Sequence, residues 1–164
     1  MKLLSILRHA KSSWSDSSLD DHARPLNKRG LRDAPRMGAL LREQGLVPET
    51  ILSSTARRAR DTAFAVAEAA GFPDEVRFTR SLYGADPDTW LEALRELPDT
   101  AGHALVVGHN PGLEELVALL VGESHVLPTA ALAVVELPIE RWRAVDPGLP
   151  GSLRALWRPR DLGE

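Results

Sequence analysis

Short apolar segments of strand length alternate along this chain with longer segments of helical periodicity. The apolar segments are rich in Leu, Val and Ile and are bounded by turn residues, as expected for strands buried in a sheet. The predicted strands are residues 3–7, 50–53, 76–78, 103–108, 131–137 and 152–157. This alternation predicts an α/β fold with a largely parallel sheet, and the two late strands resemble a hairpin that makes the sheet mixed.

Helix start and stop signals separate the strands. Asn27 is an expected N-cap for a first helix that stops at Gly45, and residues 55–70 form a second helix before Gly71. Asp86 and Pro87 suit the cap and first position of a third helix, and residues 113–121 predict a fourth. The expected architecture is therefore a three-layer sandwich, a mostly parallel central sheet flanked by helices.

The composition limits the function classes. A chain of 164 residues with 43% hydrophobic and 26% charged residues suits one domain, which we place at residues 1–164. A net charge of −3 argues against dedicated nucleic-acid binding, and the absence of cysteine excludes disulfides and thiol chemistry. No apolar stretch approaches the roughly 18 residues of a membrane helix, and residues 1–7 are too short for a signal peptide. We therefore expect a cytoplasmic protein without a membrane partner, and the oligomeric state stays open.

Arginine and histidine side chains follow three of the predicted strands. Arg8 and His9 end the first strand, Arg57 and Arg58 follow the second, and His109 follows a later one. Ligands of open α/β sheets bind beyond the carboxyl ends of the strands, so these groups are expected to converge. Arginine binds phosphate oxygens and neutral histidine is a nitrogen nucleophile, a combination suited to phosphoryl transfer. Taken singly, each of these residues is equally well explained as a surface arginine or as a histidine in a turn.

Other motifs are weak. The chain has neither a Walker phosphate loop nor a His-Glu-x-x-His helix, and its five histidines lack metal-ligand spacing. We expect no metal site and no cofactor. His103 is interpreted as structural. The remaining polar loop residues are better explained as solvated than as ligands, and they are His22, His125, Asp16, Asp20 and Asp21.

Three ordered blocks of the sequence carry a family resemblance. The first is Leu-Arg-His-Ala-Lys at residues 7–11. The second spans residues 53–63, with Arg58 four positions before Thr62, and the third is Val-Val-Gly-His-Asn-Pro at residues 106–111. In content and order the blocks resemble the signature of the histidine phosphatase superfamily. That resemblance implies a phosphoglycerate mutase-like α/β core.

Two further segments narrow the resemblance. Residues 24–30 read Arg-Pro-Leu-Asn-Lys-Arg-Gly and residues 128–131 read Pro-Thr-Ala-Ala. Together with the short chain, they are similar to the SixA-type phosphohistidine phosphatase branch. The resembling blocks run from about residue 3 to residue 137 and so cover most of the chain.

The resemblance implies a role for each site residue. His9 would attack phosphorus and become a transient phosphohistidine, which water then hydrolyses. Arg8, Arg58 and His109 would bind the phosphoryl oxygens and stabilise the transition state. No metal or cofactor would be required. The implied partner is a phosphohistidine-bearing protein or a small phosphate ester.

The sequence departs from the family pattern at two places. Ala10 stands where the family usually has glycine, which narrows the backbone freedom of that turn. Residues 81–86 lack a carboxylate where larger members carry their proton donor, and Asp86 is better explained as a helix cap. Alkyl phosphate esters need a protonated leaving group more than a phosphoramidate does. The missing acid therefore favours a protein-borne phosphohistidine as substrate.

Other functions remain as alternatives. A small-metabolite phosphomonoesterase would need an acid in the pocket, for which Asp86, Glu114 and Glu115 are the candidates. A non-catalytic phosphate-binding module would need a pocket in which His9 cannot reach a bound phosphate. Mutase activity is least expected, because a mutase must enclose its intermediate.

Overall fold

A computed structural model describes residues 1–163 of the protein, and they form one six-stranded sheet with strand order β3-β2-β4-β1-β5-β6. Strands β1 to β4 pair in parallel, whereas β5 pairs antiparallel with both β1 and β6. The predicted mixed sheet is thus confirmed. The strands are β1 (Lys2–Arg8), β2 (Thr50–Ser54), β3 (Arg77–Thr79), β4 (His103–Gly108), β5 (Leu132–Leu137) and β6 (Ser152–Trp157).

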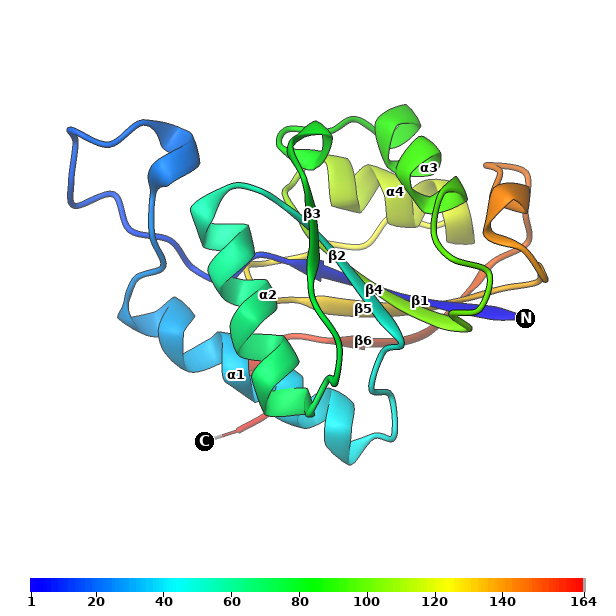
Figure 1. The fold of residues 1–164 in the computed structure, drawn as a ribbon, viewed down its shortest axis with the longest axis horizontal. Helices are drawn as coiled ribbons and strands as arrows, with labels where there is room; N and C mark the ends of the chain where they lie inside the picture. Colours follow the sequence, from blue (N-terminus) through cyan, green and yellow to red (C-terminus); the bar gives the residue numbers. More distant parts are fainter. Residues whose placement is uncertain (164) are drawn as a thin grey trace.

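Helices cover both faces of this sheet, so the predicted three-layer sandwich is also confirmed. Figure 1 shows α1 and α2 on one face and α3 and α4 on the other. The helices are α1 (Lys28–Glu43), α2 (Arg57–Ala70), α3 (Pro87–Arg95) and α4 (Gly112–Val121). Short 3-10 turns complete the chain: η1 (Asp21–Ala23), η2 (Arg80–Leu82), η3 (Trp142–Ala144) and η4 (Pro159–Asp161). No helix within residues 1–163 is both long and apolar enough to cross a membrane.

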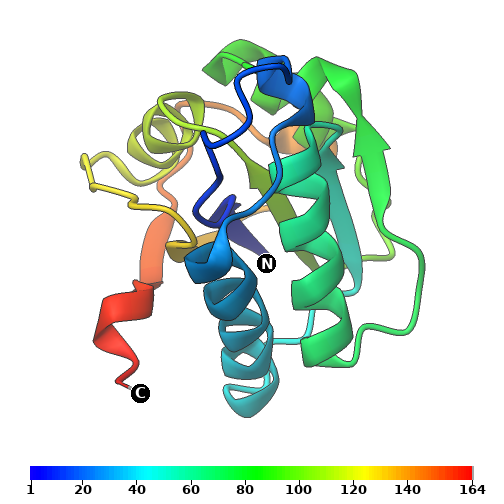
Figure 2. The same ribbon diagram turned by 90° about the vertical axis from the view of Figure 1, so that its left-hand side faces the viewer.

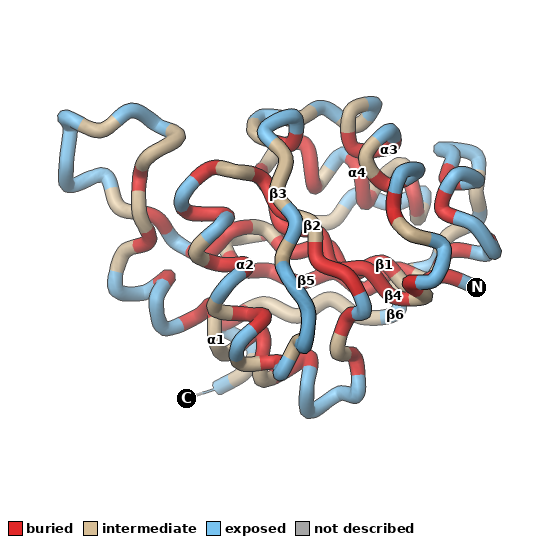
Figure 3. Tube along the Cα trace, viewed as in Figure 1, coloured by how far each residue is buried: buried red, intermediate tan, exposed pale blue. Residues whose placement is uncertain are grey.

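Each face of the sheet has its own apolar core. Trp90 of α3 and Leu113 of α4 pack in one cluster, and Met37 of α1 and Val66 of α2 pack in the other. Every residue of β4 is buried, which explains why a continuous apolar run rather than an alternating one marks this central strand. The central strands are accordingly drawn as buried in Figure 3.

The helix boundaries follow from the capping signals. The Asn27 side chain accepts a hydrogen bond from the Gly30 amide, and Asp86 accepts one from the Thr89 amide. Gly45 and Gly71 have positive φ angles of 69° and 75° where α1 and α2 end. The interpretation of Asp86 as a helix cap is therefore confirmed.

The start of α1 lies directly against the segment that follows β1. A Cβ atom at Gly30 would lie 2.1 Å from the Lys11 carbonyl oxygen, so only glycine allows this approach. The loop between them contains η1 and is closed at its base by a bridge between Ser12 and Leu26. Figure 2 looks onto this edge of the sheet, where the loop of residues 10–26 crosses above α1.

Candidate active site

The four predicted site residues meet at the carboxyl edge of the parallel strands. Arg8 ends β1, His9 follows it, Arg58 lies in the first turn of α2, and His109 follows β4. The rings of His9 and His109 lie 5.1 Å apart between centroids, and both arginines act electrostatically on both rings. The convergence predicted from the strand order is therefore present in the structure.

The backbone holds His9 in one orientation. Its Nδ1–H donates to the carbonyl of Ala10 at 2.8 Å, so the ring keeps its lone pair on Nε2. The Ala130 amide donates to the carbonyls of Arg8 and His9, at 3.1 and 3.0 Å. Burial lowers the pKa of His9 to about 3, so the ring is neutral at physiological pH. A neutral imidazole with a free Nε2 is a competent nucleophile.

Each of the other three site residues has a buried nitrogen atom without a partner. Within residues 1–163, the Nε atoms of Arg8 and Arg58 and the Nδ1 atom of His109 are buried without a hydrogen-bond partner. Buried polar groups are normally paired, so such a cluster indicates a site for an anion with several acceptor oxygens. His109 is fixed through Nε2, 2.9 Å from the Ser54 hydroxyl, and burial lowers its pKa to about 4.

Thr62 explains the spacing of the second sequence block. Its hydroxyl donates to the Arg58 carbonyl at 2.7 Å, one helical turn earlier, and accepts from the Ala10 amide at 3.0 Å. The residue thereby joins α2 to the turn that carries His9. Ala10 does not have a positive φ, so this turn tolerates alanine in place of the usual glycine.

A carboxylate that the sequence analysis placed in a solvated loop lies at the site. Asp21 of η1 accepts from Arg58 Nη2 at 3.0 Å, and its carbonyl accepts from Arg58 Nη1 at 2.6 Å. The Tyr83 hydroxyl also donates to this carboxylate and, with the arginines Arg58 and Arg24, holds the pKa of Asp21 well below its usual range. Asp21 is therefore ionised, as an acceptor rather than a proton donor. Only the three-dimensional path of the loop reveals this contact.

His22 was also interpreted as a solvated loop residue, and the structure corrects this. Its Nε2 lies 2.9 Å from the Thr55 hydroxyl, and its ring meets Tyr83 edge-on at 4.9 Å between centroids. Tyr83 in turn packs against the His109 ring. The sequence offered no signal for these contacts, because η1 and η2 come together only through the fold.

The three candidate proton donors differ in availability. The Asp86 carboxylate caps α3, and Glu114 accepts from Asn110 Nδ2 at 2.8 Å and from the Leu127 amide at 3.0 Å. Glu115 and Asp86 are both exposed, and both line a hollow of about 220 Å³ together with His109. Of these three, Glu115 alone has no hydrogen bond of its side chain within residues 1–163.

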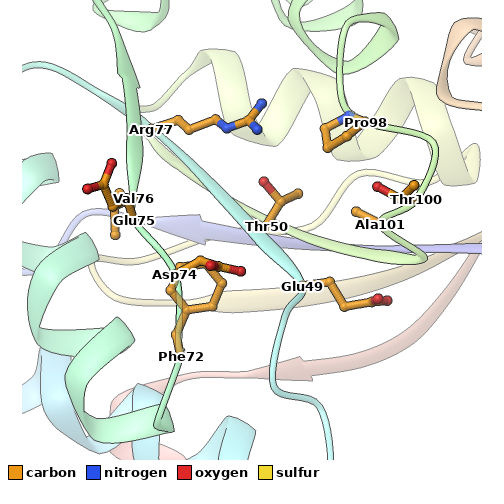
Figure 4. A pocket seen from close by; sticks show the side chains of 10 residues that line it. All are labelled: Glu49, Thr50, Phe72, Asp74, Glu75, Val76, Arg77, Pro98, Thr100 and Ala101. Atoms are coloured by element: carbon orange, nitrogen blue, oxygen red, sulfur yellow. The ribbon is translucent and has the colours of Figure 1, made fainter.

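A larger hollow lies at the opposite edge of the sheet. It has a volume of about 800 Å³ and is lined by Glu49 and Thr50 at the start of β2, Asp74 before β3, and Ala101 before β4. Figure 4 shows that none of the four predicted site residues reaches it. Residues 1–163 contain no cluster of metal-ligating side chains. The four predicted site residues therefore lie at the carboxyl edge of the sheet and not at this hollow.

Comparison with known proteins agrees with this geometry. A sequence model described as "Histidine phosphatase superfamily (branch 1)" matches residues 4–96. An uncharacterized protein of Mycobacterium tuberculosis (strain H37Rv) is 36% identical over 153 residues, covering 87% of this chain and 93% of its own. An uncharacterized chloroplastic protein of Arabidopsis thaliana is 38% identical over 149 residues, covering 85% of this chain and 68% of its own.

Solved structures share the fold over nearly the whole chain. The protein histidine phosphatase SixA complexed with tungstate has a TM-score of 0.83 at 26% identity, with 98% of this chain and 99% of that chain covered. A protein of Agrobacterium tumefaciens assigned as a phosphohistidine phosphatase SixA has a TM-score of 0.83 at 27% identity, with 96% and 98% covered. A mycobacterial glucosyl-3-phosphoglycerate phosphatase, at 18% identity, shares the fold alone, with a TM-score of 0.68 and 93% and 97% covered. The chain belongs to the histidine phosphatase superfamily (branch 1), has its phosphoglycerate mutase-like fold, and most resembles the SixA-type phosphatases among these structures.

Proposed function

We propose that this phosphatase hydrolyses phosphohistidine in a partner protein through a covalent intermediate on His9. The observation that carries the proposal is the neutral His9 ring, whose free Nε2 lies among buried donors without partners. A phosphate-binding module would need the donors but would have no use for an oriented nucleophile. The same arrangement disfavours a purely structural role for these residues.

The first step transfers the phosphoryl group to the enzyme. His9 Nε2 donates its lone pair to phosphorus while the bond between phosphorus and the substrate imidazole breaks. The guanidinium groups of Arg8 and Arg58 and the Nδ1–H of His109 bind the phosphoryl oxygens and neutralise their charge. The Ser54 hydroxyl oxygen accepts from the Ala56 amide, and with its hydrogen directed to Nε2 the proton of His109 is on Nδ1. The departing imidazole nitrogen takes a proton from solvent.

The second step regenerates the enzyme. A water molecule attacks phosphorus, and the bond between phosphorus and His9 Nε2 breaks. Inorganic phosphate leaves with the oxygen of this water, and the protons of the water stay on phosphate or exchange with solvent. Positioning and charge neutralisation supply the catalysis, so no metal ion or cofactor takes part. Chelation by EDTA is expected to leave turnover unchanged.

The leaving group selects the substrate class. Asp86 and Glu114 are engaged in structural hydrogen bonds, and Asp21 is held ionised, so these carboxylates are poor proton donors. The imidazole of a phosphohistidine leaves more easily than an alkoxide and depends less on such a donor. This supports phosphohistidine over alkyl esters.

A small phosphate ester is the second candidate substrate. Glu115 is exposed in the hollow beside His109, where its carboxyl group has room to approach the leaving oxygen of a small ester. Replacement of Glu115 by Gln separates the two candidates. It is expected to leave hydrolysis of phosphohistidine unchanged and to reduce ester hydrolysis if Glu115 is the acid.

The test measures phosphate release from a phosphohistidine protein domain and from a panel of small phosphate esters in parallel. We expect release mainly from the phosphohistidine protein and its complete loss in His9→Ala, which should remain folded. Release mainly from one ester would favour the metabolite phosphatase. Phosphate binding without turnover of any substrate would favour the binding module.

A further inference from the structure

Another hollow opens between α1 and the segment that follows β6. Its volume is about 780 Å³, and four arginines line it: Arg29, Arg32, Arg36 and Arg160. We call these residues and the space between them the arginine hollow. The whole chain has a net charge of −3, so four guanidinium groups around one hollow contrast with the overall charge of the molecule.

Positive charge in the arginine hollow exceeds the negative charge that faces it. Asp33 lies within 3.6 Å of Arg29, 3.4 Å of Arg32 and 3.2 Å of Arg36, so three guanidinium groups share one carboxylate. Within residues 1–163, the one carboxylate paired with Arg160 is that of its neighbour Asp161, at 3.9 Å. Among these residues, four guanidinium groups thus face the two carboxylates of Asp33 and Asp161, which leaves a surplus of positive charge for an anionic ligand.

Buried contacts hold the bottom of the arginine hollow, whereas three of its four guanidinium groups are exposed. The side chain of Asp33 is 2% exposed, and Arg36 donates to the carbonyls of Pro159 and Gly163, which joins α1 to the segment after β6. The side chains of the other three are 58%, 67% and 74% exposed. Buried contacts thus fix the spacing of the hollow, while most of its guanidinium groups remain available.

The arginine hollow opens at the same edge of the sheet as His9. Strand β6 is antiparallel to β5, which is antiparallel to β1, so β6 and β1 run in the same direction and end at the same edge. The start of α1 contacts the backbone of Lys11, two residues after His9. Figure 2 shows the C-terminal segment in red beside the blue start of α1, on the face that also carries the ends of the parallel strands.

We propose that the arginine hollow binds an acidic surface of the protein substrate while its phosphohistidine occupies the site at His9. This inference rests on the proposed function and names the partner chemistry of the same enzyme. Guanidinium groups bind carboxylates through two parallel hydrogen bonds, and complementary charge orients a partner during encounter. On a chain of net negative charge, a positive hollow beside the active site directs acidic partners to that face.

Synthetic peptides test this inference. Each carries one phosphohistidine and a Gly/Ser spacer of about 10 residues, which reaches at most ~35 Å when extended. One peptide ends in four glutamates and its partner ends in four glutamines. We expect kcat/KM of the wild-type enzyme to be about tenfold higher for the glutamate peptide through a lower KM, with kcat equal. Added salt should remove the preference.

Matched variants locate the effect. Arg29→Gln, Arg32→Gln and Arg160→Gln together should reduce the preference to less than about twofold while leaving turnover of the glutamine peptide unchanged. The control variant removes three exposed arginines of other elements, one on edge strand β3 and two in the segment between β5 and β6, and it carries Arg77→Gln, Arg141→Gln and Arg143→Gln. The control variant has the same net charge as the hollow variant and should keep the preference for the glutamate peptide.

The outcomes separate the two proposals. If the wild-type enzyme hydrolyses both peptides equally, or if the control variant loses as much preference as the hollow variant, the arginine hollow is not a docking site, although the proposed function stands. If the hollow variant loses activity on both peptides equally, the arginines support the fold or the active site and the inference fails. If the wild-type enzyme hydrolyses neither peptide but cleaves small esters, the proposed function fails and the inference fails with it.

Discussion

Replacing Thr62 by Val should both destabilise the protein and slow its chemistry. Valine has nearly the shape of threonine, so the change opens no large cavity. It removes the hydroxyl that accepts from the Ala10 amide at 3.0 Å, and Ala10 is fully buried. An orphaned buried amide costs about 1–3 kcal/mol. The Arg58 carbonyl loses one donor but keeps the α-helical bond from the amide of residue 62, so it adds little.

This cost corresponds to a fall in Tm of ~2–12 °C for a chain of this size, measurable by thermal or urea unfolding. Turnover should fall as well, because the Ala10 carbonyl orients His9. Thr62→Ser is the matched control, since it keeps the hydroxyl and loses one methyl group, at about 1 kcal/mol. It should retain activity. A Thr62→Val protein with wild-type stability and turnover would refute the reasoning.

Three other tests concern the active site and the elements that support it. Arg58→Ala should lower phosphatase kcat/KM by about 100-fold, whereas Arg57→Ala, which removes an exposed arginine, should change it less than about twofold; equal effects would mean that Arg58 does not bind phosphate. Gly30→Ala should lower Tm by several degrees in a thermal melt, because its Cβ would lie 2.1 Å from the Lys11 carbonyl oxygen, and an unchanged Tm would show that this contact relaxes freely. Burial lowers the pKa of three histidines to about 3, 4 and 4, and unfolded histidine titrates near 6.5, so the unfolded chain binds more protons between about pH 4 and 6.5. Stability in urea should therefore fall as the pH drops through this window, and a flat profile would contradict the neutral assignment. These histidines are His9, His103 and His109.

The strands and helices could be predicted from the sequence because the patterns that mark them are local. Buried parallel strands need uninterrupted apolar residues, and β4 shows this pattern throughout. Helix ends need particular caps, and Asn27 and Asp86 supply them. Arg8 and His9 were located correctly because the end of a strand in an open sheet has a known place in space.

The contacts of the long loop could not be predicted in the same way. Asp16, Asp20 and Asp21 have similar local sequences, yet Asp16 accepts from Ser18, Asp20 caps η1 and Asp21 binds Arg58. Asp21 is oriented by partners distant in sequence, Arg58 of α2 and Tyr83 after η2, which no local pattern identifies. Long-range partners such as Tyr83 leave no periodic signal in the sequence.

The covalent mechanism is tested most directly by looking for the phosphoryl group on His9 itself. The enzyme is mixed with a phosphohistidine protein, quenched within one turnover in alkaline detergent, which preserves the nitrogen–phosphorus bond, and mapped by mass spectrometry. We expect a transient phosphoryl group on Nε2 of His9 that appears before free phosphate and is absent in His9→Ala. Phosphate release without label on His9, or label on another residue, would contradict this mechanism.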